Sequence, residues 1–175
     1  VVTDVGQHQM VASRYYKYRK RNSNITSGGL GTMGFALPAA IGAKVGKAEE
    51  PVIAIIGDGG FQMTVQELGT IAQYNIPVKI VVLNNDFLGM VRQWQQLFFE
   101  KRYSFTEMTN PYFIKIAQAY GIPATRVTEK TEPSSAIEQL LADEGPSFLE
   151  VRVIKEENVF PMVPSGDSVS NIRLE

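Results

Sequence analysis

The chain has 175 residues, of which 44% are hydrophobic and 20% are charged, and its formal net charge is −1. This length suits one domain with one core, and the composition is that of a folded globular protein. No apolar run approaches the ~20 residues needed to cross a bilayer, and the charge is too small to hold a nucleic acid, so neither a membrane nor a nucleic acid is expected as partner. Because the chain has no cysteine, disulfides and thiolate metal sites are excluded, and a cytoplasmic location is expected.

Apolar, β-branched segments alternate with helical patterns, which is typical of parallel strands joined by crossover helices. Two of the expected strands contain the apolar runs VIAII and KIVVL, so helices should cover both faces of the sheet. The expected fold is therefore a three-layer α/β/α domain with a mostly parallel central sheet. We expect strands at residues 1–5, 51–57, 77–84, 123–128 and 147–154, and helices at 8–20, 33–46, 61–74, 88–101, 110–120 and 133–143.

The two ends of the chain differ from this regular pattern. The opening residues VVTDVG resemble a strand already under way, which indicates a fragment of a longer protein. Residues 155–175 contain two prolines and little periodicity, so a surface tail or flap should follow a domain that spans residues 1–154.

A basic cluster, RYYKYRKR, occupies residues 14–21. Basic residues interleaved with tyrosines can bind a polyanion. On a helix they more often form a solvated face, and we favour that interpretation.

Asp58 stands between glycines at the point where an apolar strand ends, in the stretch VIAIIGDGGF. The flanking Gly57, Gly59 and Gly60 let the backbone come close to a ligand, and the following helix would direct its free N–H groups at an anion. A carboxylate would repel a phosphate at that place unless a divalent cation lay between them. A cation beside Asp58 would therefore require a second oxygen ligand from the protein.

The next strand ends in Asn84, Asn85 and Asp86. Asn85 follows Asp58 by 27 residues, about one αβ repeat, and consecutive parallel strands end at the same edge of a sheet. One carboxylate and one amide could therefore share Mg²⁺ and leave it enough charge to hold a diphosphate. Taken singly, Asp58 would be a helix N-cap and Asn85 a turn former, but the spacing favours the metal site.

The segment GLGTMG, residues 29–34, matches the G-x-G-x-x-G dinucleotide fingerprint. That fingerprint requires an apolar strand before the glycines, whereas RKRNSNITSG is polar and a poor strand. We therefore interpret these glycines as positions that admit a ligand beside the backbone, and Met33 as a flexible apolar side chain that projects into the gap.

The pair GDGGF and NND resembles the thiamine diphosphate signature. In that family the aspartate, the second asparagine and a backbone carbonyl two residues further on bind Mg²⁺, which implies Asp58, Asn85 and Phe87 here. Five blocks in order resemble the carboxyl-terminal, diphosphate-binding domain of the acetohydroxyacid synthase (acetolactate synthase) family. They are TDVGQHQM, GGLGTMGFALPAAIGA, IIGDGGFQMTVQEL, LNNDFLGMVRQWQ and VFPMVPSG.

The resemblance implies a role for each matched position. Gly6, Gln7 and His8 would bind the diphosphate, and Met33 would hold the cofactor in its bent form. The family pattern often has serine at the position of Gly60 and an aromatic residue at the position of Val11. The implied cofactor contacts are Val5, Gly6, Gln7, His8, Gly31, Met33, Gly57, Asp58, Gly59, Gly60, Asn85, Phe87, Leu88, Gly89 and Met90.

Met90, Val91, Trp94 and Phe98 share one stripe of the helix that follows the asparagines. In an unidentified protein such a stripe is typical of core. The resemblance instead implies that Met90, Val91 and Trp94 lie at the substrate entrance, where the tryptophan favours the larger 2-ketoacid acceptor.

The implied activity is the condensation of pyruvate with pyruvate or 2-ketobutyrate with loss of CO₂, the first shared step of branched-chain amino acid synthesis. It implies thiamine diphosphate, Mg²⁺ and FAD, a homodimer or tetramer with its active site between subunits, and a regulatory small subunit. The activating glutamate belongs to an amino-terminal pyrimidine-binding domain, and FAD to a middle domain. Neither is recognisable here, so no catalytic residue is assigned and the chain alone should be inactive. Alternatives are another thiamine diphosphate-dependent decarboxylase, oxidase or carboligase, and a nonenzymatic phosphate-binding module.

Overall fold

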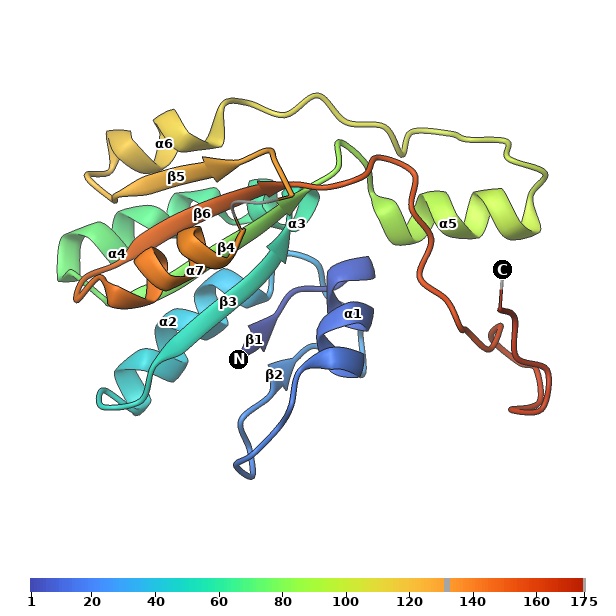
Figure 1. Ribbon diagram of the computed structural model, residues 1–175, viewed down its shortest axis with the longest axis horizontal. Helices are drawn as coiled ribbons and strands as arrows, with labels where there is room; N and C mark the ends of the chain where they lie inside the picture. Colours follow the sequence, from blue (N-terminus) through green and yellow to red (C-terminus); the bar gives the residue numbers. More distant parts are fainter. Residues whose placement is uncertain (131–132, 175) are drawn as a thin grey trace.

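Six parallel strands form the central sheet of the computed structural model, which describes residues 1–130 and 133–174 (Figure 1). The strand order is β2-β1-β3-β4-β6-β5, and every neighbouring pair is parallel. The strands are β1 (Val2–Thr3), β2 (Ile25–Thr26), β3 (Val52–Gly57), β4 (Val78–Asn84), β5 (Ala124–Val127) and β6 (Ser147–Arg152). The helices are α1 (Gln7–Tyr15), α2 (Ala36–Gly46), α3 (Asp58–Met63), a short 3₁₀ turn (Val65–Glu67), α4 (Leu68–Tyr74), α5 (Gly89–Phe98), α6 (Phe113–Ala119) and α7 (Pro133–Ala142).

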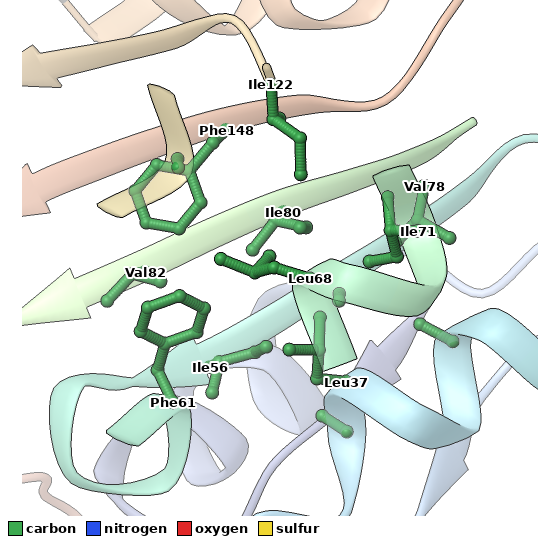
Figure 2. Packing of buried hydrophobic residues seen from close by; sticks show 14 of the residues in the cluster. Leu37, Ile56, Phe61, Leu68, Ile71, Val78, Ile80, Val82, Ile122 and Phe148 are labelled. Carbon is green, nitrogen blue, oxygen red and sulfur yellow. The ribbon is translucent and has the colours of Figure 1, made fainter. Parts of the chain in front are cut away.

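The larger core lies on the face of the sheet that α2, α3, α4 and α6 cover (Figure 2). Phe61 lies near its centre, with its ring centroid 5.2 Å from that of Phe113 and 5.3 Å from that of Phe148. A smaller cluster on the opposite face packs α7 against β5 and β6 through Val127, Leu140 and other buried side chains. Helices therefore cover both faces, and the predicted three-layer α/β/α fold is confirmed.

The pairing of β3 with β4 fixes which residues meet at the carboxyl edge of the sheet. The register runs from Val52 opposite Val78 to Gly57 opposite Leu83. The next residue on each side is Asp58 and Asn84, so the two polar segments begin side by side. From β1 the chain turns outward to β2, and from β3 it proceeds to β4 on the other side. The point between β1 and β3 is therefore a topological switch point, where α/β sheets bind ligands.

Several predicted helices are shorter in the structure. The helix predicted at 8–20 ends at Tyr15, because Tyr16 is extended and the like charges that follow oppose a helix. The helix predicted at 33–46 begins at Ala36, since Gly34 has a φ of 82°. That predicted at 110–120 begins at Phe113, after Pro111, which disfavours helix in the residue before it. The remaining end differences are small: the helix predicted at 88–101 covers Gly89–Phe98, and that at 133–143 covers Pro133–Ala142.

The single helix predicted at 61–74 is wrong in detail. Helix already begins at Asp58, and the chain then divides into α3, the 3₁₀ turn and α4. The break falls at Thr64, whose φ is −134° and whose hydroxyl donates to the carbonyl of Gly34 over 3.1 Å. This side-chain bond ties α3 to the turn before α2.

The strand prediction was incomplete. The polar segment before GLGTMG, which we took for a poor strand, contains the two-residue strand β2 at the edge of the sheet. The five predicted strands are present but each is shorter than predicted, and β1 has only two residues. None of the described helices is long and apolar enough to cross a membrane.

The last segment and α5 lie beyond the carboxyl ends of the strands (Figure 1). Arg14 on α1 donates to the carbonyls of Phe160 and Pro161 over 2.6 Å each. The fully buried Arg92 on α5 donates to the Glu157 carbonyl over 2.8 Å. The tail is thus an irregular segment that these donors fix against α1 and α5.

Candidate cofactor and metal site

A cavity of about 880 Å³ opens at the carboxyl edge of the sheet, between the ends of β1, β3 and β4. Its lining includes every residue that the resemblance implied as a cofactor contact. It also includes residues that were not predicted, among them Lys130, Arg152 and Glu157. The cavity therefore extends past the predicted site, towards the ends of β5 and β6 and the start of the tail.

Asp58 is the first residue of α3 and is 2% exposed. Its Oδ2 accepts the backbone N–H of Asp86 over 2.8 Å and the side-chain amide of Asn110 over 2.7 Å. Its Oδ1 accepts the N–H of Gly59 over 3.1 Å. Burial raises the pKa of Asp58, and these hydrogen bonds act in the opposite direction. A buried carboxylate held this way gains from a cation, because a positive charge would offset the cost of burial.

Asn85 and Phe87 lie on the loop that leads from β4 to α5. The Oδ1 of Asn85 accepts the N–H of Phe87 over 3.2 Å, which leaves a lone pair on that oxygen. Among the residues that the structure describes, the carbonyl of Phe87 accepts no backbone hydrogen bond, whereas the neighbouring carbonyls of Asp86 and Leu88 do. Both oxygens are therefore available to a ligand, on the same cavity as Asp58.

Asp86 is the second carboxylate at this edge, and Arg152 occupies it. Two guanidinium nitrogens of Arg152 donate to its two oxygens over 3.0 and 2.5 Å, and this pairing lowers the pKa of Asp86. Arg152 thus balances the negative charge of Asp86. Asp58 remains as the carboxylate whose charge a cation can balance.

Within residues 1–130 and 133–174 no cluster of three His, Cys, Asp or Glu side chains is suited to a metal ion. A cation at this edge would have to be held by one carboxylate, an amide and a backbone carbonyl, together with oxygens of a ligand. That mixture of oxygen donors suits Mg²⁺, which usually binds one or two carboxylates plus phosphate oxygens. The donor set therefore fits the implied metal.

His8 lies on the first turn of α1 beside the glycines of the cavity. A Cβ added at Gly57 would lie 2.9 Å from Cε1 of the imidazole, so any side chain there would have to displace the ring. Burial lowers the pKa of His8 to about 4, and its Nε2 is buried with no hydrogen-bond partner among the described residues. A buried ring nitrogen without a partner favours a polar ligand, to which Nε2 can donate only when it carries a proton.

Asp4, which the sequence analysis did not single out, fixes the turn that carries Met33. This fully buried carboxylate accepts the backbone N–H groups of Gly34 over 3.0 Å and Ala36 over 2.8 Å. A Cβ at Gly60 would lie 2.4 Å from its Oδ1. The family pattern often has serine at this position. In this chain Gly60 has no side chain, which leaves room for the carboxylate of Asp4.

Helix α5 buries polar side chains and exposes apolar ones, unlike an ordinary amphipathic helix. Arg92 and Gln93 are its buried side chains, whereas Val91 is 45% exposed and Trp94 is 39% exposed. The typical-core interpretation of the apolar stripe is therefore wrong for this chain. Met90 and Val91 line the large cavity, and Met90 and Trp94 line a neighbouring hollow of about 550 Å³ that the tail borders.

Gln7 connects the end of β1 to this helix and to the tail. Its side-chain amide donates to Oε1 of Gln93 and to the carbonyl of Glu157, over 2.8 Å each. Gln93 in turn accepts the N–H of Val159 over 2.9 Å. The side-chain nitrogen of Gln7 is therefore already engaged by protein acceptors, although the residue lines the cavity.

The basic cluster is exposed along its whole length, and only Arg14 and Tyr15 belong to a helix. The rings of Tyr16 and Tyr18 pack on each other at 4.8 Å, and Lys20 pairs with Glu50 over 2.9 Å. These contacts agree with the solvated surface that we favoured, although it lies mostly on a loop.

Comparison with known proteins agrees with this geometry. The family of thiamine pyrophosphate enzymes, C-terminal TPP binding domain, matches residues 4–151. "Acetolactate synthase isozyme 2 large subunit" of Escherichia coli (strain K12) is 50% identical over 173 residues, 98% of this chain and 32% of that protein. "Acetolactate synthase, mitochondrial" of Schizosaccharomyces pombe is 50% identical over 169 residues, 97% of this chain and 25% of that protein. "Acetolactate synthase 2, chloroplastic" of Nicotiana tabacum is 49% identical over 183 residues, 100% of this chain and 28% of that protein.

The chain spans a third or less of the length of these relatives, at 32%, 25% and 28%. The family match covers the loops that carry all the predicted cofactor contacts, from the end of β1 to β6. The chain belongs to the family of C-terminal TPP-binding domains of thiamine pyrophosphate enzymes.

Proposed function

We propose that the complete product of this gene is a thiamine diphosphate-dependent acetolactate synthase, and that this chain is its cofactor-binding domain. The observation that carries the proposal is the meeting of Asp58, Asn85 and Phe87 on one cavity at the carboxyl edge of β3 and β4. The names of relatives about 50% identical over nearly the whole chain support the choice of reaction.

Asp58, Asn85 and the carbonyl of Phe87 would hold Mg²⁺. The neutral Asn85 and the pairing of Asp86 with Arg152 leave the cation with net positive charge. That charge is what the diphosphate of the cofactor requires. His8, whose buried Nε2 has no partner among the described residues, would contact a diphosphate oxygen and donate to it once Nε2 carries a proton. Met33, on the turn that Asp4 fixes, would support the cofactor in its bent form.

Thiamine diphosphate, when bound, supplies the electron sink for the decarboxylation of pyruvate. The remaining tasks fall to the protein, which binds the cofactor, orients it and controls access. Met90 and Val91 line the cavity and Trp94 lies beside its neighbouring hollow. These three side chains would border the path by which a 2-ketoacid enters. Overall, two pyruvate molecules would give 2-acetolactate and CO₂, and 2-ketobutyrate as acceptor would give 2-aceto-2-hydroxybutyrate.

We further propose that the site is completed by another subunit. Trp94 and Val91 are exposed large apolar side chains beside the cavity, as expected of a surface that a partner covers. A homodimer or tetramer would bring an activating glutamate to the cofactor, and FAD would bind mainly outside this chain. A regulatory small subunit belongs to the same proposal. The cytoplasm remains our expected location, and we note that relatives are named mitochondrial and chloroplastic.

The test is a product analysis of the complete gene product with pyruvate, Mg²⁺ and thiamine diphosphate. Acetolactate formation that depends on both additions would support the proposal. Acetaldehyde as the sole product would indicate a decarboxylase, and failure to bind the cofactor at all would favour a nonenzymatic phosphate-binding module. The 175-residue chain alone should form no acetolactate, and formation by the isolated chain would refute the need for a partner subunit.

A further inference from the structure

Asn110 lies on the loop between α5 and α6 and reaches back to the polar edge of the sheet. Its side-chain nitrogen is 2.7 Å from Oδ2 of Asp58, 2.9 Å from Oδ1 of Asn84 and 2.9 Å from Oδ1 of Asp86. Its Oδ1 accepts the side-chain amide of Gln62 over 2.6 Å. One amide group thus connects the ends of two strands, helix α3 and the loop after β4.

The hydrogen bonds of Asp58 distinguish its two oxygens. Oδ2 accepts from both Asn110 and the N–H of Asp86, which occupies the two lone pairs of that oxygen. Oδ1 accepts only the longer bond from Gly59 and keeps a lone pair. Oδ1 is therefore the oxygen that can coordinate a cation.

We propose that Asn110 is a positioning residue that holds Oδ2 of Asp58 and so presents Oδ1 to the divalent cation. The inference rests on the proposed function, because it assumes that a cation binds at this edge. Asn110 itself touches no cation in this account. It acts through Asp58, as hydrogen-bond partners of metal ligands commonly do.

The acceptors of Asn110 are themselves fixed. Asn84 donates to the fully buried Glu150 over 2.7 Å, and Arg126 donates to both oxygens of Glu150 over 2.8 and 3.0 Å. The guanidinium carbon of Arg126 lies 4.3 Å from the ring centroid of Tyr112, two residues after Asn110. This chain of contacts opposes rotation of the Asn110 amide.

The loop that carries Asn110 is also paired with the loop that carries Phe87. The N–H of Leu88 donates to the carbonyl of Thr106 over 2.8 Å, and the N–H of Met108 donates to that of Asp86 over 2.9 Å. The segment 106–110 therefore supports two of the three candidate ligands, Asp58 and Phe87, at the same time.

The test measures cation affinity directly in the complete gene product. Mn²⁺ is titrated at saturating thiamine diphosphate, and the free ion is followed by electron paramagnetic resonance. Asn110→Ala should weaken Mn²⁺ binding by about tenfold or more. It should also alter the spectrum of the bound ion, because the carboxylate of Asp58 could then turn and offer a different oxygen.

Glu107→Gln is the matched control on the same loop, since Glu107 is exposed and pairs with Lys155 rather than Asp58. It should leave Mn²⁺ affinity unchanged. Gln62→Met, which removes only the bond to the Asn110 oxygen, should fold in any case and give a smaller loss. Thermal unfolding without cation reports whether each variant is folded.

Unchanged affinity and spectrum in both Asn110→Ala and Gln62→Met would overturn this inference alone. An equal loss in Glu107→Gln would also overturn it, because the effect would then belong to the loop as a whole. Failure of the unaltered protein to bind Mn²⁺ with thiamine diphosphate would overturn the proposed function, and this inference with it.

Discussion

Strands β3 and β4 lie among buried apolar side chains along most of their length, and among buried polar side chains at their carboxyl ends. Their middle parts are buried among apolar side chains such as Ile56 and Ile80, whereas their ends are buried among polar ones such as Asp58 and Asn84. The middle is stabilised by contact area, which depends little on direction. The edge is stabilised by directional hydrogen bonds, and a single missing partner there leaves a buried polar group unsatisfied. The middle should therefore govern stability and the edge should govern ligand binding.

The largest effect on stability should come from the apolar middle. Phe148→Ala removes a ring that is 1% exposed and should lower the free energy of unfolding by about 4 kcal/mol. Urea denaturation of the 175-residue chain measures this. Phe105→Ala is the matched control, because Phe105 is fully exposed, and it should change stability little. Equal losses in the two variants would contradict the assignment of the core.

His8 lies at the polar edge of the sheet, but its imidazole is buried as a core side chain is, so it should affect both stability and ligand binding. Its pKa is about 4 in the folded chain against an ordinary value of 6.5. As the pH falls below 6.5, His8 binds a proton in the unfolded chain but stays neutral in the folded chain. Stability should therefore decline between pH 6.5 and 4 by about 3 kcal/mol through this residue. His8→Gln should remove that part of the slope, and identical slopes in the two proteins would argue against a buried neutral imidazole.

Asp58→Asn should separate binding from stability. The substitution keeps the shape and removes the charge, so cation affinity in the presence of thiamine diphosphate should fall by about a hundredfold, or about 2.8 kcal/mol. Stability without ligand should change little, because removal of a charge that burial disfavours offsets the loss of the bond that Oδ1 accepts from Gly59. Calorimetric titration with Mg²⁺ and urea denaturation measure the two effects. A loss of stability without a loss of affinity would assign Asp58 to the fold alone.

Trp94 lies outside both regions. Trp94→Leu should leave unfolding and cation affinity as they are, because the side chain is 39% exposed in this chain. In the complete gene product it should reduce the preference for 2-ketobutyrate over pyruvate by about tenfold. The ratio of the two products in competition measures this. An unchanged ratio would remove Trp94 from the substrate entrance.

The smallest effect should come from the ion pair at the rim of the edge. The side chains of Arg152 and Asp86 are 34% and 25% exposed, so solvent weakens their attraction, and Arg152→Gln should cost less than about 1 kcal/mol. Because the pairing lowers the pKa of Asp86, its contribution is complete above the ordinary aspartate pKa and is lost as the pH falls through the lower folded value. Urea denaturation at pH 7 and pH 3 measures the difference. A larger loss at pH 3 than at pH 7 would contradict the pairing.

The sequence was sufficient for features that depend on local patterns. Apolar runs placed β3 and β4, and the spacing of Asp58 and Asn85 placed both at one edge of the sheet. The resemblance named residues that the structure brings together around one cavity, although their roles as ligands stay predictions.

The features that were missed depend on distant contacts. Asn110 lies 52 residues from Asp58 in sequence, and no local pattern connects them. Asp4 caps the turn before α2 from 30 residues away. The burial of Arg92 rather than the apolar stripe of α5 follows from the tail, which supplies carbonyl acceptors from 65 residues further on. An amphipathic pattern predicts that one face is covered, but not by which partner.

The most direct test of the central claim is to locate the cation. Crystals of the complete gene product grown with thiamine diphosphate and Mn²⁺ would show the ion in an anomalous difference map. We predict one peak at about 2.0 to 2.4 Å from a carboxylate oxygen of Asp58, the amide oxygen of Asn85 and the carbonyl oxygen of Phe87. A peak coordinated by Asp86 without Asp58, or no peak at the carboxyl edge of β3 and β4, would contradict the account.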